Sequence, residues 1–521
     1  MMDMTTKSFA GESAPTFTGN RALQIEEPLV FEIGSAVTCG VDLEEPEAVE
    51  SRLGDMERTE AIGLAGLSEP EAVRHYVRLS QKNYSIDSGI FPLGSCTMKH
   101  NPRLNEKMAR LPGFGDIHPL QPQRTVEGAV RAMAELSDWL MTLTGMPAVA
   151  LSPKAGAHGE LCGMIAIRAA LEARGEAATR RVVLVPDSAH GTNPATAALL
   201  GFQVRPVAAG KDGTVHIGAV REALGDDVAA MMLTNPNTCG LFEPEIAEIA
   251  AALHDAGAYL YCDGANFNAI AGKVRPGDLG VDAMHINLHK TFSTPHGGGG
   301  PGAGPVVFSK ALAPFAPLPL LKLEGDAWTL VEDSPAASDG AGEGAPRPFG
   351  RLVAFHGQMG MFTRALTYML SFGADGIRQA SEDAVLNANY IRAKLRDVMS
   401  QPFGDRACMH EVLFDDSFLK GTGLTTLDFA KAMIDEGFHP MTVYFPLVVH
   451  GAMLIEPTES ESKHSLDQFI AALRGLALAA REGETERFKG APRFAPRRRL
   501  DETRAARQPV LRWRPKDATA S

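Results

Sequence analysis

Residues 287–302 have the sequence NLHKTFSTPHGGGGPG. This stretch decides the fold prediction. Its His-Lys pair, His289 and Lys290, stands at the end of an apolar run, and a run of glycines follows the pair. Glycine has no Cβ, so a glycine run lets the backbone pass close to a bound molecule. A His-Lys pair also occurs on ordinary protein surfaces, and the rest of the chain therefore has to decide its meaning.

Enzymes that use pyridoxal phosphate (PLP) often present their cofactor lysine in this way. The side chain of that lysine is held near the aldehyde carbon of the cofactor. Lys290 is therefore the predicted attachment point and the first catalytic candidate.

The chain around this stretch alternates short apolar segments with amphipathic ones, which predicts a mostly parallel sheet covered on both faces. Ligands of such sheets gather outside the carboxyl ends of the strands. The predicted strands cover 181–186, 229–234 and 258–263, and the predicted helices include 126–144, ended by Gly145, and 243–256.

Two candidates for the cofactor ring follow predicted strands. Asp263 ends one strand 27 residues before Lys290 (290 − 263), and its carboxylate could hold a proton on the pyridine nitrogen. His190 could stack on one face of the ring, and Ala265 is small enough to line the other. An aspartate that caps a turn and an ordinary loop histidine are the alternatives.

Two further sets of candidates would bind the phosphate and the phenolic oxygen of PLP. In the segment KAGAHGE, residues 154–160, Gly156 and Ala157 open a helix whose first N–H groups could bind a phosphate. Asn235, in an Asn-Pro turn, could donate to the phenolic oxygen. A glycine-rich helix start and a plain β-turn are the alternatives. The order of these groups along the chain is that of fold type I PLP enzymes.

The length of 521 residues predicts more than one core. We expect an N-terminal segment of helices and loops over 1–125, a large PLP-binding domain over 126–384 and a smaller C-terminal domain over 385–482. A polar tail covers 483–521. Within the large domain, the Ala-, Gly- and Pro-rich stretch 332–348 predicts an exposed loop, with a helical pattern resuming at Phe355.

Composition excludes several classes of partner. The net charge of −13 argues against nucleic acid and anionic membranes, which favour basic surfaces. No apolar run reaches the length of a membrane span, and the N-terminus lacks a signal-peptide core, so a cytoplasmic location is expected. The six cysteines form no CxxC pair, so no metal site and no disulfide framework are expected.

Four segments together resemble one family: FPLGSCTMK (91–99), SAHGTNPA (188–195), LHKTF with the following glycines (288–302), and VYFPL through HGAMLIEPTE (443–459). It is the PLP-dependent glycine decarboxylase, or P-protein, of the glycine cleavage system, and in particular the lysine-carrying subunit 2 of its two-subunit bacterial form. The resemblance covers roughly residues 75–515. Lys154 and His158 depart from the Asn-like and Gln-like residues expected in the phosphate loop.

The resemblance implies an α/β fold of type I, similar to that of aspartate aminotransferase. A large domain would carry a mostly parallel seven-stranded sheet, and the smaller C-terminal domain would be α+β. It implies an oxidoreductase activity: decarboxylation of glycine with release of CO2 and transfer of the aminomethyl group to the lipoyl arm of H-protein. It also suggests Ser95 and Thr97 as ligands of the glycine carboxylate and His289 as a contact of the phosphate.

The resemblance implies partners as well. The fused form of the family is nearly twice as long, so this chain is expected to need a separate subunit 1, in an α2β2 heterotetramer. Two alternatives stay open. The chain could be another fold type I PLP decarboxylase or lyase, or a non-catalytic partner subunit.

Overall fold

The computed structural model describes residues 26–44, 47, 49–60, 62–297, 302–333 and 345–514. The chain divides into two compact units: Met1–Tyr84 together with Ala491–Ser521, and Ser85–Gly490. The boundaries predicted at residues 125, 384 and 482 stay predictions. Most of the predicted loop at 332–348 lies outside the described residues, which omit 334–344.

The unit that contains the N-terminus is held by short helices and by one buried carboxylate. Glu27 accepts hydrogen bonds from Arg78, at 2.7 and 2.6 Å, and contacts His75 Nδ1 at 3.0 Å. Ser68 begins the longest helix of the unit with a capping box that Glu71 completes. The helices are α1 (Val30–Ile33), η2 (Gly54–Met56), α2 (Glu69–Gln81) and α15 (Glu502–Arg507).

The centre of the other unit, residues 85–490, is a seven-stranded sheet with the order β1-β7-β6-β5-β4-β2-β3. All neighbouring pairs from β6 to β3 are parallel, whereas β7 is antiparallel to both of its neighbours. The mostly parallel sheet expected from the sequence is therefore confirmed. Its strands are β1 (Ala148–Ala150), β2 (Val182–Pro186), β3 (Gln203–Val207), β4 (Val228–Thr234), β5 (Tyr259–Asp263), β6 (Ala283–His285) and β7 (Val306–Phe308).

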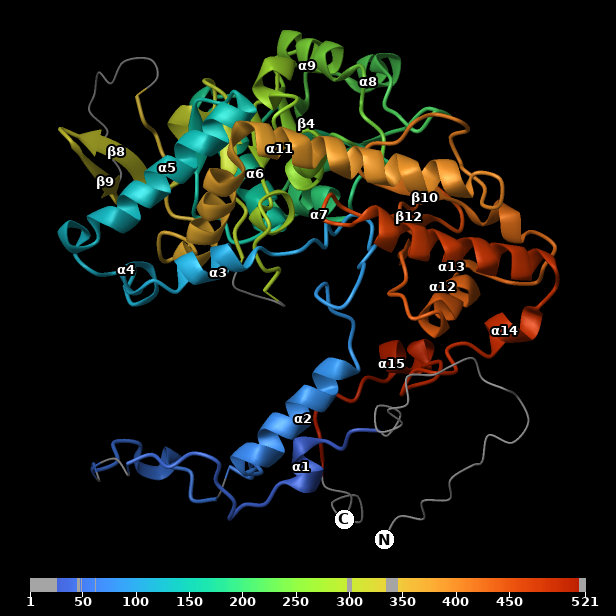
Figure 1. The fold of residues 1–521 in the computed structure, drawn as a ribbon. Coiled ribbons are helices and arrows are strands. Elements are labelled where there is room, and N and C mark those ends of the chain that lie inside the picture. The colour runs from blue at the N-terminus through green and yellow to red at the C-terminus, as the bar shows by residue number, and fades with distance from the viewer. Residues whose placement is uncertain are drawn as a thin grey trace. The chain divides into compact units, whose positions relative to one another are not determined.

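Helices cover both faces of this sheet (Figure 1). Along β2, Val183 and Val185 pack in one apolar cluster with α6, and Val182 and Leu184 pack in another with α5 and α9. Strands buried on both faces need nearly continuous apolar sequence, which is why these segments were recognisable. The covering helices are α5 (Glu127–Thr144), α6 (Gly156–Ala173), α7 (Thr192–Leu199), α8 (Ile217–Ala223) and α9 (Ile246–Asp255).

The C-terminal part of the same unit is built on a small antiparallel sheet with the order β10-β12-β11. The long helix α11 (Met359–Leu395), which kinks at Gly373, precedes it. Its elements are β10 (Val412–Phe414), α12 (Thr426–Asp435), β11 (Thr442–Val443), β12 (Met453–Ile455), α13 (Lys463–Arg481) and α14 (Thr485–Lys489). The remaining elements are α3 (Arg103–Ala109), α4 (Pro112–Gly115), α10 (Leu288–Thr291), the hairpin β8 (Leu320–Glu324) and β9 (Ala327–Val331), and the short helices η3 (Gln123–Thr125), η4 (Gly264–Ala269), η5 (Pro276–Leu279), η6 (Ala313–Phe315) and η7 (Asp416–Leu419).

Two helices begin later than their sequence patterns predict. Helix α9 begins at Ile246 rather than Glu243, because the Glu243 carboxylate accepts hydrogen bonds from Val215 N–H and Asn237 and is fixed in the preceding turn. Helix α11 begins at Met359 rather than Phe355, because Gly357 has a φ of 131° that no helix contains. The helix predicted over 126–144 is found, and Gly145 ends it with a left-handed φ of 69°.

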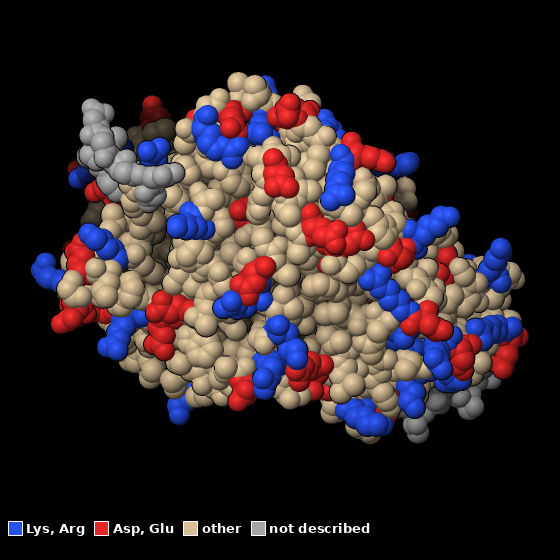
Figure 2. All heavy atoms as spheres, turned by 90° about the horizontal axis from the view of Figure 1, so that it is seen from above, with Lys and Arg blue, Asp and Glu red and all other residues tan. Residues whose placement is uncertain are grey.

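Surface charge and helix character can be described for the part of the chain that the structure covers. Basic and acidic side chains are interspersed on the described part of the face seen in Figure 2, without a patch of one sign. Within the described ranges, no helix combines the length and the apolar character needed to cross a membrane.

Candidate active site

The carboxyl ends of β4, β5 and β6 bring three of the site's residues to one edge of the sheet. Asn235 directly follows β4, Asp263 is the last residue of β5, and His285 is the last residue of β6. Thr234 is paired in register with Asp263, so Asn235 and Asp263 lie on neighbouring strands. Parallel strands bring their carboxyl ends to the same edge, as the sequence argument required.

Asp263 is buried, with 2% of its surface exposed, and donors surround its carboxylate. Ala265 N–H donates to Oδ1 at 2.9 Å, and Asn193 Nδ2 donates to Oδ2 at 3.1 Å. His285 Nε2 lies 3.4 Å from Oδ1. Burial by itself raises the pKa of Asp263, but the attraction of His285 and Lys290 and these two hydrogen bonds outweigh it, so the pKa is lowered. The carboxylate is therefore ionised at neutral pH.

A second buried acid, Glu160 on α6, lies beside it. Asn193 Nδ2 bridges the two carboxylates, donating to Glu160 Oε2 at 2.9 Å, and the Thr192 hydroxyl donates to Oε1 at 2.8 Å. Burial, and then the negative charge of Asp263, raise the pKa of Glu160 to about 7. Glu160 takes up a proton before Asp263 does, because two close carboxylates do not both stay charged at low cost.

Lys290 lies on the short helix α10, just after β6, and is buried with 8% of its surface exposed. Its Nζ donates to the backbone oxygen of Ser95 at 2.9 Å. Two glycines after Lys290 pack closely against the backbone: a Cβ on Gly304 would lie 2.3 Å from the backbone oxygen of Ala155, and one on Gly302 would lie 2.6 Å from that of Lys154. The close passage of the glycine run by a bound molecule stays a prediction. Residues 298–301 of the glycine run lie outside the described residues.

Gly156 and Ala157 form the first turn of α6, an 18-residue helix without a side-chain cap at Ala155. Their N–H groups are therefore among the unpaired donors of a helix start, where an anion is favoured. Gly156 has no room for a side chain, since a Cβ there would lie 2.8 Å from Asn287 Oδ1 and 3.0 Å from His285 Nε2. The helix start thus lies beside the same strand end as Asp263.

Asn235 is buried and has one unsatisfied polar atom. Its Oδ1 accepts from Glu243 N–H at 3.0 Å, whereas its Nδ2 has no hydrogen-bond partner among the described residues. Nδ1 of His289 is also buried, and no described residue is its hydrogen-bond partner. Burial, and then the charges of His296, Lys290 and His285, lower the pKa of His289 to about 3, so this imidazole is neutral.

His190 lies in the loop before α7 and is exposed. Its Nδ1 is 2.8 Å from the Thr192 hydroxyl, and its ring meets that of Phe445 edge to face at 5.8 Å. Ala265 is half-buried in η4, directly beyond Asp263.

The two residues suggested for substrate binding lie in the loop at 91–99. Ser95 is brought to the lysine, since its backbone oxygen accepts from Lys290. The Thr97 hydroxyl is fully buried and donates to Glu456 Oε1 at 2.6 Å, and Thr97 N–H donates to Oε2 at 2.9 Å. Cys96, between them, is a free thiol, as are the other five cysteines.

Sequence reasoning missed His285, Glu160 and Asn193, which surround Asp263. The available signal was a single polar residue in an apolar context: His285 in the strand Ala283–His285, and Glu160 in a helix of small and apolar residues. Tyr261, whose hydroxyl lies 2.7 Å from His285 Nδ1, completes this buried set.

Two family models match the chain. The model "Glycine dehydrogenase, C-terminal domain" matches residues 380–491, and the model "Aminotransferase class-V" matches residues 162–316. The second match covers most of α6, though not its first turn, and includes β4 with the following Asn235, β5 with Asp263, and Lys290.

Curated relatives match nearly the whole chain. A Caulobacter vibrioides protein named "Probable glycine dehydrogenase (decarboxylating) subunit 2" is 68% identical over 507 residues, which is 97% of this chain and 95% of the relative. This chain belongs to the glycine dehydrogenase (decarboxylating) subunit 2 family. A family member of the same name from Listeria innocua is 48% identical over 498 residues, covering 94% of this chain and 99% of the relative. The resemblance stated from the sequence is confirmed.

Solved structures confirm the fold expected for a member of this family. The inhibitor-bound glycine decarboxylase (P-protein) of the glycine cleavage system has a TM-score of 0.63 at 20% identity, covering 85% of this chain and 92% of that one. A Burkholderia pseudomallei sphingosine-1-phosphate lyase has a TM-score of 0.57 at 16% identity, covering 86% and 95%. The α/β fold of type I is thus shown.

Proposed function

We propose that this chain is the PLP-binding subunit of a cytoplasmic glycine decarboxylase. It would release CO2 from glycine and transfer the aminomethyl group to the lipoyl arm of H-protein. The observation that carries the proposal is the buried, ionised Asp263 at the sheet edge that also holds Lys290 and the unpartnered amide of Asn235. Family membership supplies glycine as the substrate.

The residues present fit PLP. Lys290 would carry it, and Asp263 would face its ring nitrogen. Nδ2 of Asn235 is a buried donor that has no acceptor in the described parts of the chain. Gly156 and Ala157, at the uncapped start of α6, would bind its phosphate. His289, with its unpartnered Nδ1, is a second phosphate candidate, and His190 and Ala265 would line the two ring faces.

When bound, PLP supplies an electron sink for the bond electrons that remain when CO2 leaves. The role of Asp263 is to hold a proton at the ring nitrogen, because its carboxylate stays ionised in a buried place. Asn193 and Ala265 keep that carboxylate oriented through their hydrogen bonds. The role of Lys290 is to hold and release a proton at Nζ, which Ser95 positions through its backbone oxygen.

Ser95 and Thr97 remain the proposed contacts of the glycine carboxylate. Ser95 is better supported, because it directly contacts Lys290, whereas the Thr97 hydroxyl already donates to Glu456.

We propose a separate subunit 1 and a lipoylated H-protein as partners, in an α2β2 heterotetramer. The family name denotes one of two subunits, and the chain covers 95% of its Caulobacter relative. The net charge of −13 supports protein and small-molecule partners rather than nucleic acid or anionic membranes.

The test combines the purified chain with subunit 1, PLP and lipoylated H-protein. Borohydride reduction followed by peptide mapping should find the cofactor on Lys290, and Lys290→Ala should lose the visible absorbance. Exchange of labelled CO2 into the glycine carboxyl should require H-protein.

The outcomes separate the alternatives. A coloured protein that exchanges no CO2 with glycine would favour the second candidate, another fold type I lyase, whose fold the sphingosine-1-phosphate lyase shares. A protein that stays colourless with PLP and subunit 1 would favour a non-catalytic subunit.

A further inference from the structure

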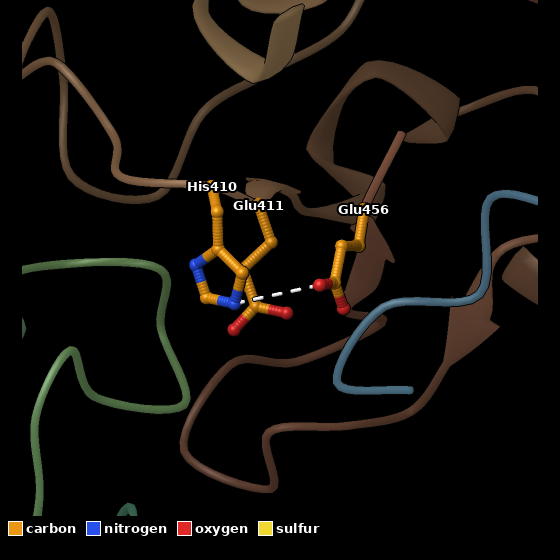
Figure 3. A group of neighbouring side chains, drawn as sticks. All are labelled: His410, Glu411 and Glu456. Atoms are coloured by element: carbon orange, nitrogen blue, oxygen red, sulfur yellow. Dashed lines mark ion pairs between the residues drawn. The ribbon is translucent and has the colours of Figure 1, made fainter. Parts of the chain in front are cut away.

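Three buried ionisable side chains meet in the C-terminal part of the unit 85–490 (Figure 3). His410 and Glu411 immediately precede β10, and Glu456 immediately follows β12. Because these strands pair antiparallel, with Val412 opposite Ile455, the two ends lie side by side. Each of the three residues has 0% of its surface exposed, and one ligand atom from each lies within 4.8 Å of the others.

The two carboxylates hold the loop that contacts Lys290. Ser95 N–H donates to Glu411 Oε2 at 2.8 Å, and the same residue's backbone oxygen accepts from Lys290 Nζ. Glu456 receives both the N–H and the hydroxyl of Thr97. Ser95 and Thr97 have left-handed φ values of 67° and 51°, which residues with side chains adopt only when their surroundings fix them.

The next question is which of the two carboxyl groups, Glu411 or Glu456, carries a proton. Glu411 Oε1 and both ring nitrogens of His410 have no hydrogen-bond partner among the described residues, and His410 Nε2 lies 3.6 Å from Glu456 Oε1. Two adjacent, fully buried carboxylates do not both ionise, because each loses its hydration and repels the other. The groups that influence this pair electrostatically include His410, Cys96, Lys290 and His296 and, beyond His410, Glu459.

The hydrogen bonds favour one distribution of charge. Glu456 receives two donors from Thr97 and Glu411 receives only one, from Ser95, so the negative charge belongs on Glu456. Burial, and then the charge of Glu456, raise the pKa of Glu411 well above its usual value. Burial lowers the pKa of His410, so the imidazole is neutral.

We propose that Glu411, protonated, and Glu456, ionised, form a positioning pair that fixes Ser95 and Thr97 against Lys290. The geometry of the pair stands on the hydrogen bonds alone, whereas its consequence for catalysis rests on the proposed function. With Glu456 ionised, the cluster carries one negative charge, and a negative charge favours the protonated form of the basic groups around it.

A divalent cation is the competing occupant of this cluster, since one histidine and two carboxylates are common ligands. Two observations favour the proton. Histidines that bind a metal usually donate their other ring N–H to a carboxylate or carbonyl, and neither nitrogen of His410 has a partner in the described chain. Three of the four carboxylate oxygens already accept hydrogen bonds from Ser95 and Thr97.

Infrared spectroscopy of the full chain without cofactor tests the proton directly. At pH 9, Glu160 and Glu243, each with a pKa of about 7, are ionised, so a remaining carbonyl stretch of a protonated carboxyl should belong to Glu411. The band should be lost in Glu411→Gln and kept in the matched control Glu461→Gln, a half-buried acid of the same part of the fold. A wild-type protein without the band, or a variant at 411 that retains it, overturns the proposal. So does one equivalent of bound metal by elemental analysis, because both acids would then be ionised.

Hydrogen exchange and a pH profile test the positioning role. Glutamine resembles a protonated carboxyl, but at 456 its NH2 would replace one of the two oxygens that accept from Thr97, so one of the two Thr97 donors would lose its acceptor. Amide exchange in the peptide 91–99 should therefore quicken at least tenfold in Glu456→Gln, and by less in Glu411→Gln. The pH profile of kcat/KM for glycine with subunit 1 and H-protein should move to lower pH in Glu456→Gln, which removes a negative charge, and keep its position in Glu411→Gln, which removes none.

Equal effects of the two substitutions, in exchange and in the profile, would refute the assignment. The carboxyl pair and the proposed function can be refuted separately. If the protein has no glycine activity, the infrared and exchange results still decide the charge state and the positioning. If it is active but the band is absent, the proposed function stands without the pair.

Discussion

Lys99 provides the sharpest test of the packing around the site. Its ammonium is buried and contacts three acceptors: Glu459 Oε1 at 2.6 Å, the Thr291 backbone oxygen at 2.9 Å and Asn268 Oδ1 at 3.0 Å. Since Thr291 follows Lys290 in the chain, the same contacts hold the helix of the reactive lysine. We predict that Lys99→Met strongly destabilises the unit 85–490.

The size of the stability loss in Lys99→Met depends on the hydrogen-bond donors that Glu459 would keep. Removing one member of a buried ion pair costs about 3–5 kcal/mol, because the remaining charge is left without its partner. Glu459 would retain two weaker donors, the Tyr368 hydroxyl at 3.3 Å and Asn268 Nδ2 at 3.4 Å. The cost should therefore lie at the lower end, about 3 kcal/mol. With a urea m value of roughly 3 kcal/mol per M, the unfolding midpoint would fall by about 1 M.

Urea unfolding, followed by tryptophan fluorescence, measures this cost. The matched control is Lys322→Met, because Lys322 pairs with Glu324 at an exposed place and should cost less than about 1 kcal/mol. Lys99→Met/Glu459→Gln should recover at least half of the loss, since it removes the unpaired charge. A Lys99→Met midpoint equal to that of Lys322→Met would refute the reasoning.

The pH dependence of this contribution has a definite sign. Burial tends to lower the pKa of Lys99, but the attraction of Glu459 outweighs it, so the pKa in the folded protein is raised above 10.5. The contribution is therefore fully present below pH 10.5 and is lost as the pH rises through the folded-state pKa. The difference between wild type and Lys99→Met should stay constant from pH 7 to 9.

Three further substitutions test the site and its support. Asp263→Asn should lower the rate of CO2 exchange at least about a hundredfold, while borohydride mapping still finds PLP on the lysine. Asn235→Asp keeps the acceptor oxygen but replaces the unpartnered NH2, and should weaken PLP binding about tenfold, measured by equilibrium titration of absorbance. Gly163→Ala should destabilise the protein by about 1–3 kcal/mol, because the new Cβ would lie 2.5 Å from the Tyr261 ring. Gly218→Ala on α8 is the control: its Cβ meets nothing within 4 Å, and it should stabilise the protein by about 0.5–1 kcal/mol. Thermal unfolding compares the two variants.

Sequence patterns were sufficient wherever a residue's position depends on its own strand. Asn235 and Asp263 follow long apolar strands, so the rule for open α/β sheets was enough to bring them to one edge. The fold class followed from the same strands, because burial on both faces requires continuous apolar sequence.

Contacts made by distant segments could not be predicted. Ser95 reaches Lys290 across 195 residues through its backbone oxygen, an atom that every residue has and no sequence pattern marks. Glu411 and Glu456 become neighbours through the antiparallel pairing of two three-residue strands, which are too short to show a period. His285 ends another three-residue strand and is buried there. In the sequence it looks like an ordinary core residue, so its contact with Asp263 could not be predicted.

The attachment of the loop 91–99 to residues far along the chain has a consequence during synthesis. Its ties to Glu411 and Glu459 span 316 and 360 residues. At about 5–20 residues per second, a ribosome needs roughly 15 to 70 s to supply the second half of these contacts. The nascent protein therefore passes through a period in which its sheet can already form but its reactive lysine has no finished surroundings, and vitamin B6 capture should be among the last events of its maturation.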